Sequence, residues 1–162
     1  MTLYKVTKKQ SGSGGSESSL YVSTNLTESL LEFWNDSRFE ITYNQYGAWS
    51  VQNLFTYDGH NMYSSPQIQH GQTSEVYIKN ISGDVILVKA VYDSSTERKD
   101  FDYGSIYMDN VEIQTNIGGS ESGITGVFGI PNGAVMKFTY KKDGSGSTGL
   151  DNIGILIYEI GE

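Results

Sequence analysis

The chain has 162 residues, enough for one domain that buries about 70% of its unfolded surface without a covalent staple. It contains no cysteine, which excludes disulfides and thiolate metal sites and fits synthesis in a cytoplasm. With 19 acidic and 11 basic residues the net charge is -8, so neither nucleic acid nor a membrane surface is expected as a partner. The beginning of the sequence also lacks the apolar core of a secretory signal peptide, and no apolar run is long enough to span a membrane.

Residues 1–18 are predicted to form an N-terminal arm and a linker. A short basic strand, TLYKVTKK, precedes QSGSGGSESS, which has almost no side chains able to join a core. Such a strand is not stable alone, so we expect Leu3, Tyr4 and Val6 to pair with an edge on another protein or on this chain's own sheet. Residues 19–162 are then the folded domain.

A short helix is predicted at the start of this domain. Thr24 or Asn25 supplies an N-cap, and Glu28 follows Asn25 at capping-box spacing. Apolar residues continue to Trp34, which predicts about two or three turns.

Beyond this helix the hydrophobic period changes to two. Phe39, Ile41 and Tyr43 alternate with polar residues, and the run at 85–91 is apolar on both faces, which indicates a central strand. About nine or ten short strands separated by Gly, Asn, Asp and Ser turns predict an all-β, antiparallel β-sandwich. Further strands are expected at 76–78, 103–108, 111–117, 124–130, 134–141 and 152–160.

Three stretches then follow one another in a characteristic order: MYSSPQIQHGQTSEVYIKNI, DVILVKAVYDSSTERKDFDYGSIYMDN and GAVMKFTYKKDGSGSTGLDNIGILIYEI. With Trp49 and Gly59 ahead of them, they resemble a jelly-roll family of bacterial and phage proteins, related to MAM and concanavalin-like sandwiches. The resemblance implies the jelly-roll architecture, and it implies little about activity because the family is defined by its fold. Thr96 departs from the family's Ser-Ser-Glu turn. The positions of this sequence that match the family's pattern are Gln72, Ser74, Ser94, Ser95, Glu97, Asp102, Tyr103, Asp109, Lys142, Asp143, Ser145, Gly149 and Asp151.

Aromatic residues between positions 43 and 63 suggest a ligand site. The chain has 12 tyrosines, and exposed rings stack on sugars while neighbouring Asn and Gln side chains bind hydroxyl groups. The candidates are Tyr43, Tyr46, Trp49 and Tyr57. The alternative is that these rings fill or edge the sandwich, since aromatic residues favour pleated, half-buried surfaces.

Acidic residues at loop ends are the candidates for a metal site. Asp102, Asp143 and Asp151 are expected to lie near one rim, where their oxygens suit calcium, the one cofactor considered. Asp102 has the alternative role of fixing a corner through bonds to backbone amides. The DGSGS segment at Asp143 has the Asp-x-Ser-x-Ser spacing of von Willebrand type A magnesium sites. No buried parallel strand precedes it, so we interpret it as a hairpin loop.

No arrangement typical of catalysis is evident. Asp100 and Asp102 on one strand face would be about 7 Å apart, within the range of glycosidase carboxylates, yet nothing marks either as buried or raised in pKa. His60 and His70 lack a nucleophile elbow or a metal motif. The chain is therefore predicted not to be an enzyme, with a polysaccharide hydrolase as the least favoured interpretation.

These features together favour a structural or attachment protein of a bacteriophage virion, in the tail, a fibre or the capsid decoration. It would dock through its arm, display the jelly roll, and have as partners other virion proteins, further copies of itself and a host cell-surface glycan. The alternative is an autonomous carbohydrate-binding adhesin module.

Overall fold

The computed structural model describes residues 6–7, 19–20, 26–144 and 151–161. Leu3 and Tyr4 of the predicted arm, and the predicted caps Thr24 and Asn25, lie outside the described residues. The elements are β1 (Val6–Thr7), β2 (Ser19–Leu20), β3 (Thr27–Leu30), the 3-10 turn η1 (Phe33–Asn35), β4 (Phe39–Tyr43), β5 (Ser50–Tyr57), β6 (His60–Ser64), β7 (Thr73–Asn80), β8 (Ile86–Ser95), β9 (Tyr103–Met108), β10 (Val111–Ile117), β11 (Ser122–Ile124), β12 (Phe128–Ile130), β13 (Val135–Lys141) and β14 (Asn152–Gly161).

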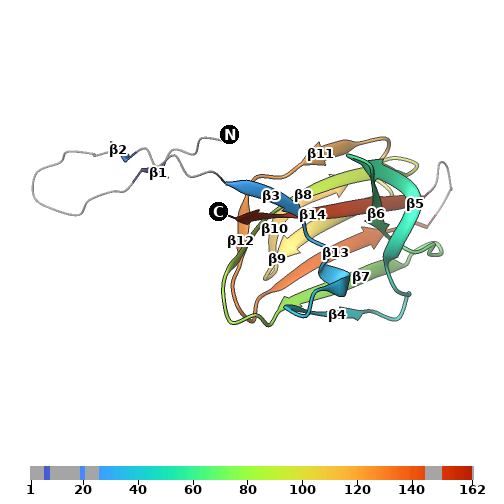
Figure 1. Ribbon diagram of the computed structural model, residues 1–162. Coiled ribbons are helices and arrows are strands. Elements are labelled where there is room, and N and C mark those ends of the chain that lie inside the picture. The colour runs from blue at the N-terminus through green and yellow to red at the C-terminus, as the bar shows by residue number, and fades with distance from the viewer. Residues whose placement is uncertain (1–5, 8–18, 21–25, 145–150, 162) are drawn as a thin grey trace, which may run out of the picture.

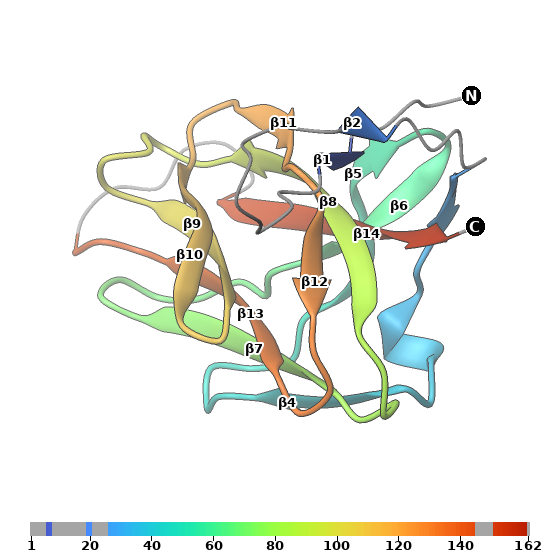
Figure 2. The same ribbon diagram turned by 90° about the vertical axis from the view of Figure 1, so that its left-hand side faces the viewer.

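Two antiparallel sheets lie face to face (Figure 1). The smaller sheet has five strands in the order β10-β9-β13-β7-β4. The larger sheet has seven strands: β11-β8-β14-β6-β5 form a continuous order, β12 also pairs with β8, and β3 pairs with β14. Figure 2 shows β12 beside β8. The predicted all-β, antiparallel sandwich is confirmed, and the jelly-roll connection of its strands stays a prediction.

The main core lies between the two sheets. Ile153, Ile155 and Ile157 point inward from alternate positions of β14, and Val76 and Ile78 point inward from β7. All five side chains are fully buried. Because burial of one such aliphatic side chain stabilises a fold by roughly 1.5–3 kcal/mol, this period-two packing is the main force holding the sheets together.

The predicted central strand at 85–91 is confirmed, because β8 pairs with β14 on one side and with β11 and β12 on the other. The predicted strand at 124–130 is interrupted in its middle. Thr125 Oγ1 accepts a hydrogen bond from Ala90 N at 2.9 Å, and Thr125 N donates to Ala90 O at 2.8 Å. A side chain therefore replaces a backbone partner there, and this separates β11 from β12.

The predicted helix at 28–34 is wrong. Residues 27–30 pair as β3 with the end of β14, and only the single turn η1 follows. Glu28 forms an ion pair with Lys89 of β8 instead of capping a helix. Long-range strand pairing overrides a local capping pattern here because the added strand extends an existing sheet. No helix in the described part of the chain has the length and apolar character needed to cross a membrane.

Val6 of the predicted arm pairs with Leu20, in a ladder of β1 and β2 that is separate from both large sheets. The residues between these two strands lie outside the described part of the chain.

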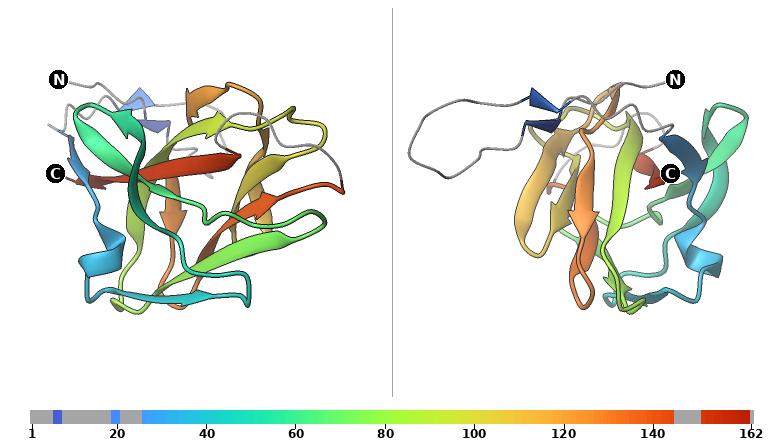
Figure 3. Two further views of the ribbon diagram at one scale, coloured as in Figure 1. Left: turned by 90° about the vertical axis from the view of Figure 1, so that its right-hand side faces the viewer. Right: turned by 60° about the vertical axis from the view of Figure 1, so that its left-hand side comes forward.

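β6 pairs with β14 only at Tyr63 and Ser64, and the rest of the β5–β6 hairpin folds over part of the outer face of the larger sheet (Figure 3). Asp58 and Gly59, both with positive φ, form its two-residue turn. Gly154 on the outer face of β14 lets the hairpin approach, since a Cβ there would lie 2.8 Å from the Phe55 ring. The hairpin and the sheet form a second apolar cluster of Phe55, Met62, Val91, Leu156 and Tyr158.

Candidate functional site

A cleft opens beside the hairpin, where the outer face of the larger sheet is no longer covered. It encloses about 360 Å³, toward the lower end of the range of about 300–1,000 Å³ that is typical of small-ligand sites. We name it the β5–β11 cleft. Its lining residues are Thr56, Tyr57, Met62, Val91, Tyr92, Asp93, Ser122, Gly123 and Ile124.

Cross-strand register assembles the floor of the β5–β11 cleft. In β8 the side chains of Val91 and Asp93 point outward, because Ala90 and Tyr92 point into the core. Ser122 of β11 lies opposite Asp93, and Ile124 lies opposite Val91. Two residues from each strand therefore share the outer face, one polar pair beside one apolar pair.

Gly123 fixes the approach of β11 to β8. It lies opposite Tyr92, and a Cβ at this position would be 2.3 Å from the Tyr92 hydroxyl oxygen. The Tyr92 ring therefore occupies the space that a side chain would take. Burial, with a smaller contribution from Glu121, raises the pKa of Tyr92, so the phenol stays neutral.

Tyr57 forms the aromatic wall of the β5–β11 cleft. Its ring contacts that of Tyr158 edge to face, with the ring centres 6.1 Å apart, so packing holds its orientation. Tyr57 is nevertheless 38% exposed, and Ile124 across the cleft is 52% exposed. A ligand entering here meets one ordered ring and one aliphatic side chain.

Asp93 is the charged group of the β5–β11 cleft. Burial raises the pKa of its carboxyl group, and the hydrogen bond from Ser94 N, at 2.8 Å, opposes that shift. No other hydrogen bond or ion pair to Asp93 occurs among the described residues. Its second oxygen is therefore available to accept a hydrogen bond from a ligand, beside the hydroxyl groups of Thr56 and Ser122.

The chemistry of the β5–β11 cleft suits binding. Asp93 is the one carboxylate among its lining residues, and no histidine lines it. A glycosidase requires two carboxylates flanking the scissile bond, and acyl transfer requires a nucleophile with an adjacent base. The pair of carboxylates is not present among the lining residues, and the Ser122 hydroxyl has Asp93 and no histidine as its neighbour there.

Of the four predicted ligand-binding residues, Tyr57 alone lines the cleft. The prediction for Trp49 is corrected: it is 1% exposed in the main core, where its Nε1 donates to Ser74 Oγ at 2.9 Å. Its ring packs against Tyr63 and Phe138 just before β5 begins, so it cannot stack on a ligand in this structure.

The other two predicted rings belong to a different region. The hydroxyl groups of Tyr43 and Tyr63 hydrogen-bond to each other, and Tyr43 is 38% exposed. Tyr46 is half-buried, and its backbone N donates to Asn44 Oδ1 at 3.3 Å. The structure does not bring them onto one surface with Tyr57.

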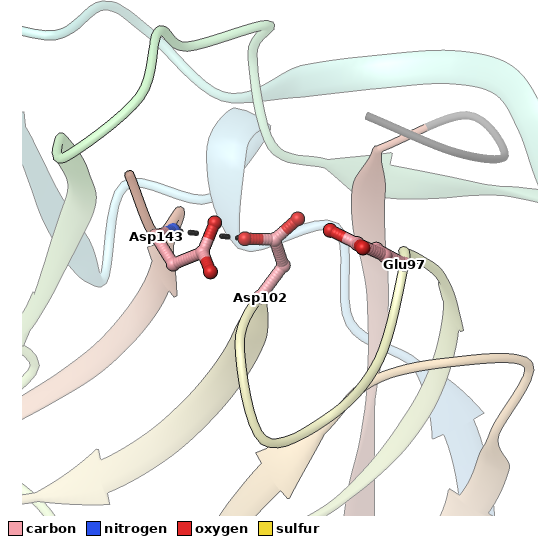
Figure 4. Close-up of side chains that lie close together, drawn as sticks. All are labelled: Glu97, Asp102 and Asp143. Atoms are coloured by element: carbon pink, nitrogen blue, oxygen red, sulfur yellow. Dashed lines mark hydrogen bonds between the residues drawn. The ribbon is translucent and has the colours of Figure 1, made fainter. Parts of the chain in front are cut away.

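The three predicted acidic residues lie near one another, since Lys142 forms ion pairs with both Asp102 and Asp151, but their partners differ. Asp102 and Asp143 meet, and Glu97 joins them, although it was not among the sequence candidates for a metal (Figure 4). Asp151 instead pairs with Lys142 and accepts a hydrogen bond from Tyr140 Oη at 3.2 Å.

Asp102 also fixes the corner before β9, as its alternative role predicts. Its Oδ1 accepts a hydrogen bond from Asp143 N at 2.8 Å, and its carbonyl oxygen accepts one from Thr96 Oγ1 at 3.0 Å. Asp100 is exposed and 3.8 Å from Arg98, so the carboxylate pair considered for hydrolysis is split between solvent and interior.

Sequence reasoning missed most of the β5–β11 cleft. Asp93, Ser122 and Ile124 come together through strand register, which local patterns do not reveal. One available signal was the Asp58-Gly59 pair, which is typical of a two-residue hairpin and would have predicted β5 and β6. No family model matches the chain, and comparison with curated proteins finds no match.

Proposed function

We propose that this chain is a non-enzymatic glycan-binding β-sandwich whose sugar site is the β5–β11 cleft. The observation that supports this proposal is the combination of the exposed, packed Tyr57 ring with the Asp93 carboxylate in one cleft. A pyranose ring has an apolar face that stacks on an aromatic ring, and hydroxyl groups that donate to a carboxylate.

Charge narrows the class of sugar. Asp93 lies in the cleft, and the whole chain has a net charge of -8. Both repel sulfated, phosphorylated and sialylated glycans. Neutral hexoses and amino sugars are the ligand class that this proposal favours.

The outer face of the smaller sheet offers a comparison surface with similar residues. Tyr77, Tyr107 and Lys137 lie side by side there by cross-strand register. Lys137 Nζ lies 4.7 Å from the centre of the Tyr107 ring, and the Tyr77 hydroxyl donates to Glu75. Because these groups already bind one another, they are less suited to a ligand than Tyr57, and Tyr77 makes a matched control.

A glycan array tests the proposal, using the full chain and the variants Tyr57→Ala, Asp93→Asn and Tyr77→Ala. We expect saturable binding to a neutral or amino sugar, with affinity lowered at least about tenfold by the first two variants and unchanged by the third. Binding that depends on Tyr77 and not on Tyr57, or no binding to any neutral or amino glycan, contradicts the proposal.

We further propose that the module is part of a bacteriophage virion and attaches through its N-terminal arm. The specific observation is the β1–β2 ladder, which pairs at two positions and stands apart from both large sheets. A ladder this short has little stability of its own, so pairing with a strand edge on another virion protein or a second copy would complete it. The sequence resemblance to phage jelly rolls supports the same proposal.

Deletion of residues 1–20 tests this second role. Particles that lack the gene would be complemented with the full or the shortened chain. We expect the shortened chain to keep its melting temperature and glycan binding but to be missing from purified particles. Normal incorporation of the shortened chain contradicts the docking role and leaves the glycan-binding proposal intact.

A further inference from the structure

Three carboxylates from distant parts of the chain meet at one rim of the sandwich. Glu97 follows β8, Asp102 precedes β9 and Asp143 follows β13. One oxygen from each lies within 4.8 Å of the oxygens of the other two. Figure 4 shows Asp102 between the other two side chains, with one of its oxygens toward Asp143 and the other toward Glu97.

The central carboxylate is fully buried and incompletely bonded. Asp102 is 0% exposed; its Oδ1 accepts the hydrogen bond from Asp143 N, and its Oδ2 accepts none. Oε2 of Glu97 is also buried without a donor. A buried carboxylate oxygen that accepts no hydrogen bond is costly, and two such oxygens on neighbouring acids call for a bound positive charge.

Lys142 supplies only part of that charge. Its Nζ lies 3.9 Å from Asp102 Oδ2, beyond hydrogen-bond distance, and it hydrogen-bonds Asp151 directly. One ammonium group is therefore shared between two carboxylates before Glu97 is counted. The Asp102 oxygen that Lys142 approaches, Oδ2, is the one that accepts no hydrogen bond, so the ammonium group leaves it incompletely satisfied.

We propose that Glu97, Asp102 and Asp143 bind a divalent cation, and that this cation is calcium. Ligand oxygens at about 2.3–2.6 Å from one ion are at most about 5 Å apart, and the three carboxylate oxygens here lie within that reach of one another. Calcium accepts an all-oxygen, irregular set of carboxylates, whereas magnesium requires a tighter octahedral arrangement. Asp151, which the sequence suggested as a ligand, is replaced in this role by Glu97.

The bound ion would join the two sheets. Glu97 continues from β8 of the larger sheet, whereas Asp102 and Asp143 flank β9 and β13 of the smaller one. Calcium would therefore close this rim of the sandwich, and removal of calcium would lower its stability through the ordinary linkage between binding and folding.

Calorimetric titration of the full chain with calcium chloride, and its melting temperature in calcium or in chelator, test the site. We expect one calcium ion per chain and a melting temperature higher by roughly 5 °C at 100 times the dissociation constant. Glu97→Gln and Asp143→Asn should each weaken binding at least about tenfold, since each removes a ligand charge while keeping the side-chain shape. Asp100→Asn, an exposed acid of the same loop, is the matched control and should bind calcium as the wild type does.

Two results overturn the proposal. One is the absence of calcium binding, or binding that Glu97→Gln leaves unchanged. The other is a pair of observations: calcium does not raise the melting temperature of the wild type, and Glu97→Gln melts at a higher temperature than the wild type in chelator. Together they would mean that a proton shared by the carboxylates, and not a metal ion, supplies the positive charge. Tyr57→Ala should leave calcium binding unchanged, so failure here is distinguishable from failure of the glycan site.

Discussion

The inner face of the larger sheet is closed and apolar, whereas its outer face is only partly covered and contains polar groups. Along β8, Val88 and Ala90 point inward and are fully buried, while Leu87 on the outer face is 46% exposed. Asp93, also on the outer face, lines the β5–β11 cleft. Adjacent residues of β8 thus face either the core or the cleft. Substitutions on the inner face should therefore change stability, and substitutions on the outer face should change ligand binding.

The largest expected effect is on the inner face. Ile155→Ala removes a fully buried side chain from the main core and should lower the free energy of unfolding by about 2–5 kcal/mol. Leu87→Ala on the outer face should lower it by about 1 kcal/mol or less, since Leu87 is already 46% exposed. Urea denaturation of both variants measures the difference, and equal losses would remove the contrast between the two faces.

The hairpin that covers the outer face provides the next test. Gly154→Ala places a Cβ 2.8 Å from the Phe55 ring and 3.1 Å from Met62 Cβ, so the hairpin has to shift. We expect a loss of about 1–3 kcal/mol together with weaker glycan binding, because the same hairpin carries Tyr57. Gly126→Ala, where a Cβ meets nothing within 4 Å, is the control. Unchanged stability in Gly154→Ala would show that the hairpin packs less closely than described.

The pH dependence of stability tests the environment of Asp93 in the β5–β11 cleft. Burial raises the pKa of Asp93 above 3.8, so the folded state favours its protonated form and its contribution to stability falls as the pH rises through the folded pKa. Asp93→Asn does not ionise and should therefore be slightly more stable than the wild type at pH 7 and no more stable at pH 3. Denaturation at the two pH values measures this, and an equal change at both would contradict the assigned cause.

The smallest expected effect is on the ion pairs that Arg38 forms with Asp36 and Glu159. Hydrogen bonds from Arg38 lower the pKa of Asp36 and of Glu159. Their contribution to stability is thus present above the unfolded values near 3.8 and 4.5, and is lost as the pH falls through the lowered folded pKa values. Arg38→Met should cost no more than about 1 kcal/mol at pH 7, since the Arg38 side chain is half-buried and still in contact with solvent, and less at pH 3. A cost that grows on acidification would contradict this explanation.

Strands with a clear alternating pattern were predictable from the sequence. Residues 103–108 and 111–117 form β9 and β10 with the predicted bounds, because their pattern is local and a two-residue turn at Asp109 and Asn110 joins them. The strand β3 was not predictable in the same way, since it is stabilised by pairing with β14, which is distant in sequence. A capping pattern without that partner predicts a helix instead.

The residues of the two candidate sites were likewise predictable only where the signal is local in sequence. Asp102 and Asp143 were candidates because acids at strand ends tend to share a rim, and the structure brings them together. Glu97 was identified only as a turn residue, because the fold of the 97–102 loop decides where its carboxylate lies. Tyr57 was a candidate for its aromatic ring, whereas Asp93 and Ser122 depend on register between β8 and β11.

The glycan site is tested most directly by titrating the ¹⁵N-labelled protein with neutral and amino oligosaccharides and recording two-dimensional NMR spectra. We expect saturable shifts of the backbone amides of Tyr57, Asp93, Gly123 and Ile124, and the loss of these shifts in Tyr57→Ala. Shifts confined to the smaller sheet around Tyr77 and Lys137, or no shift with any of these sugars, would contradict a glycan site in the β5–β11 cleft.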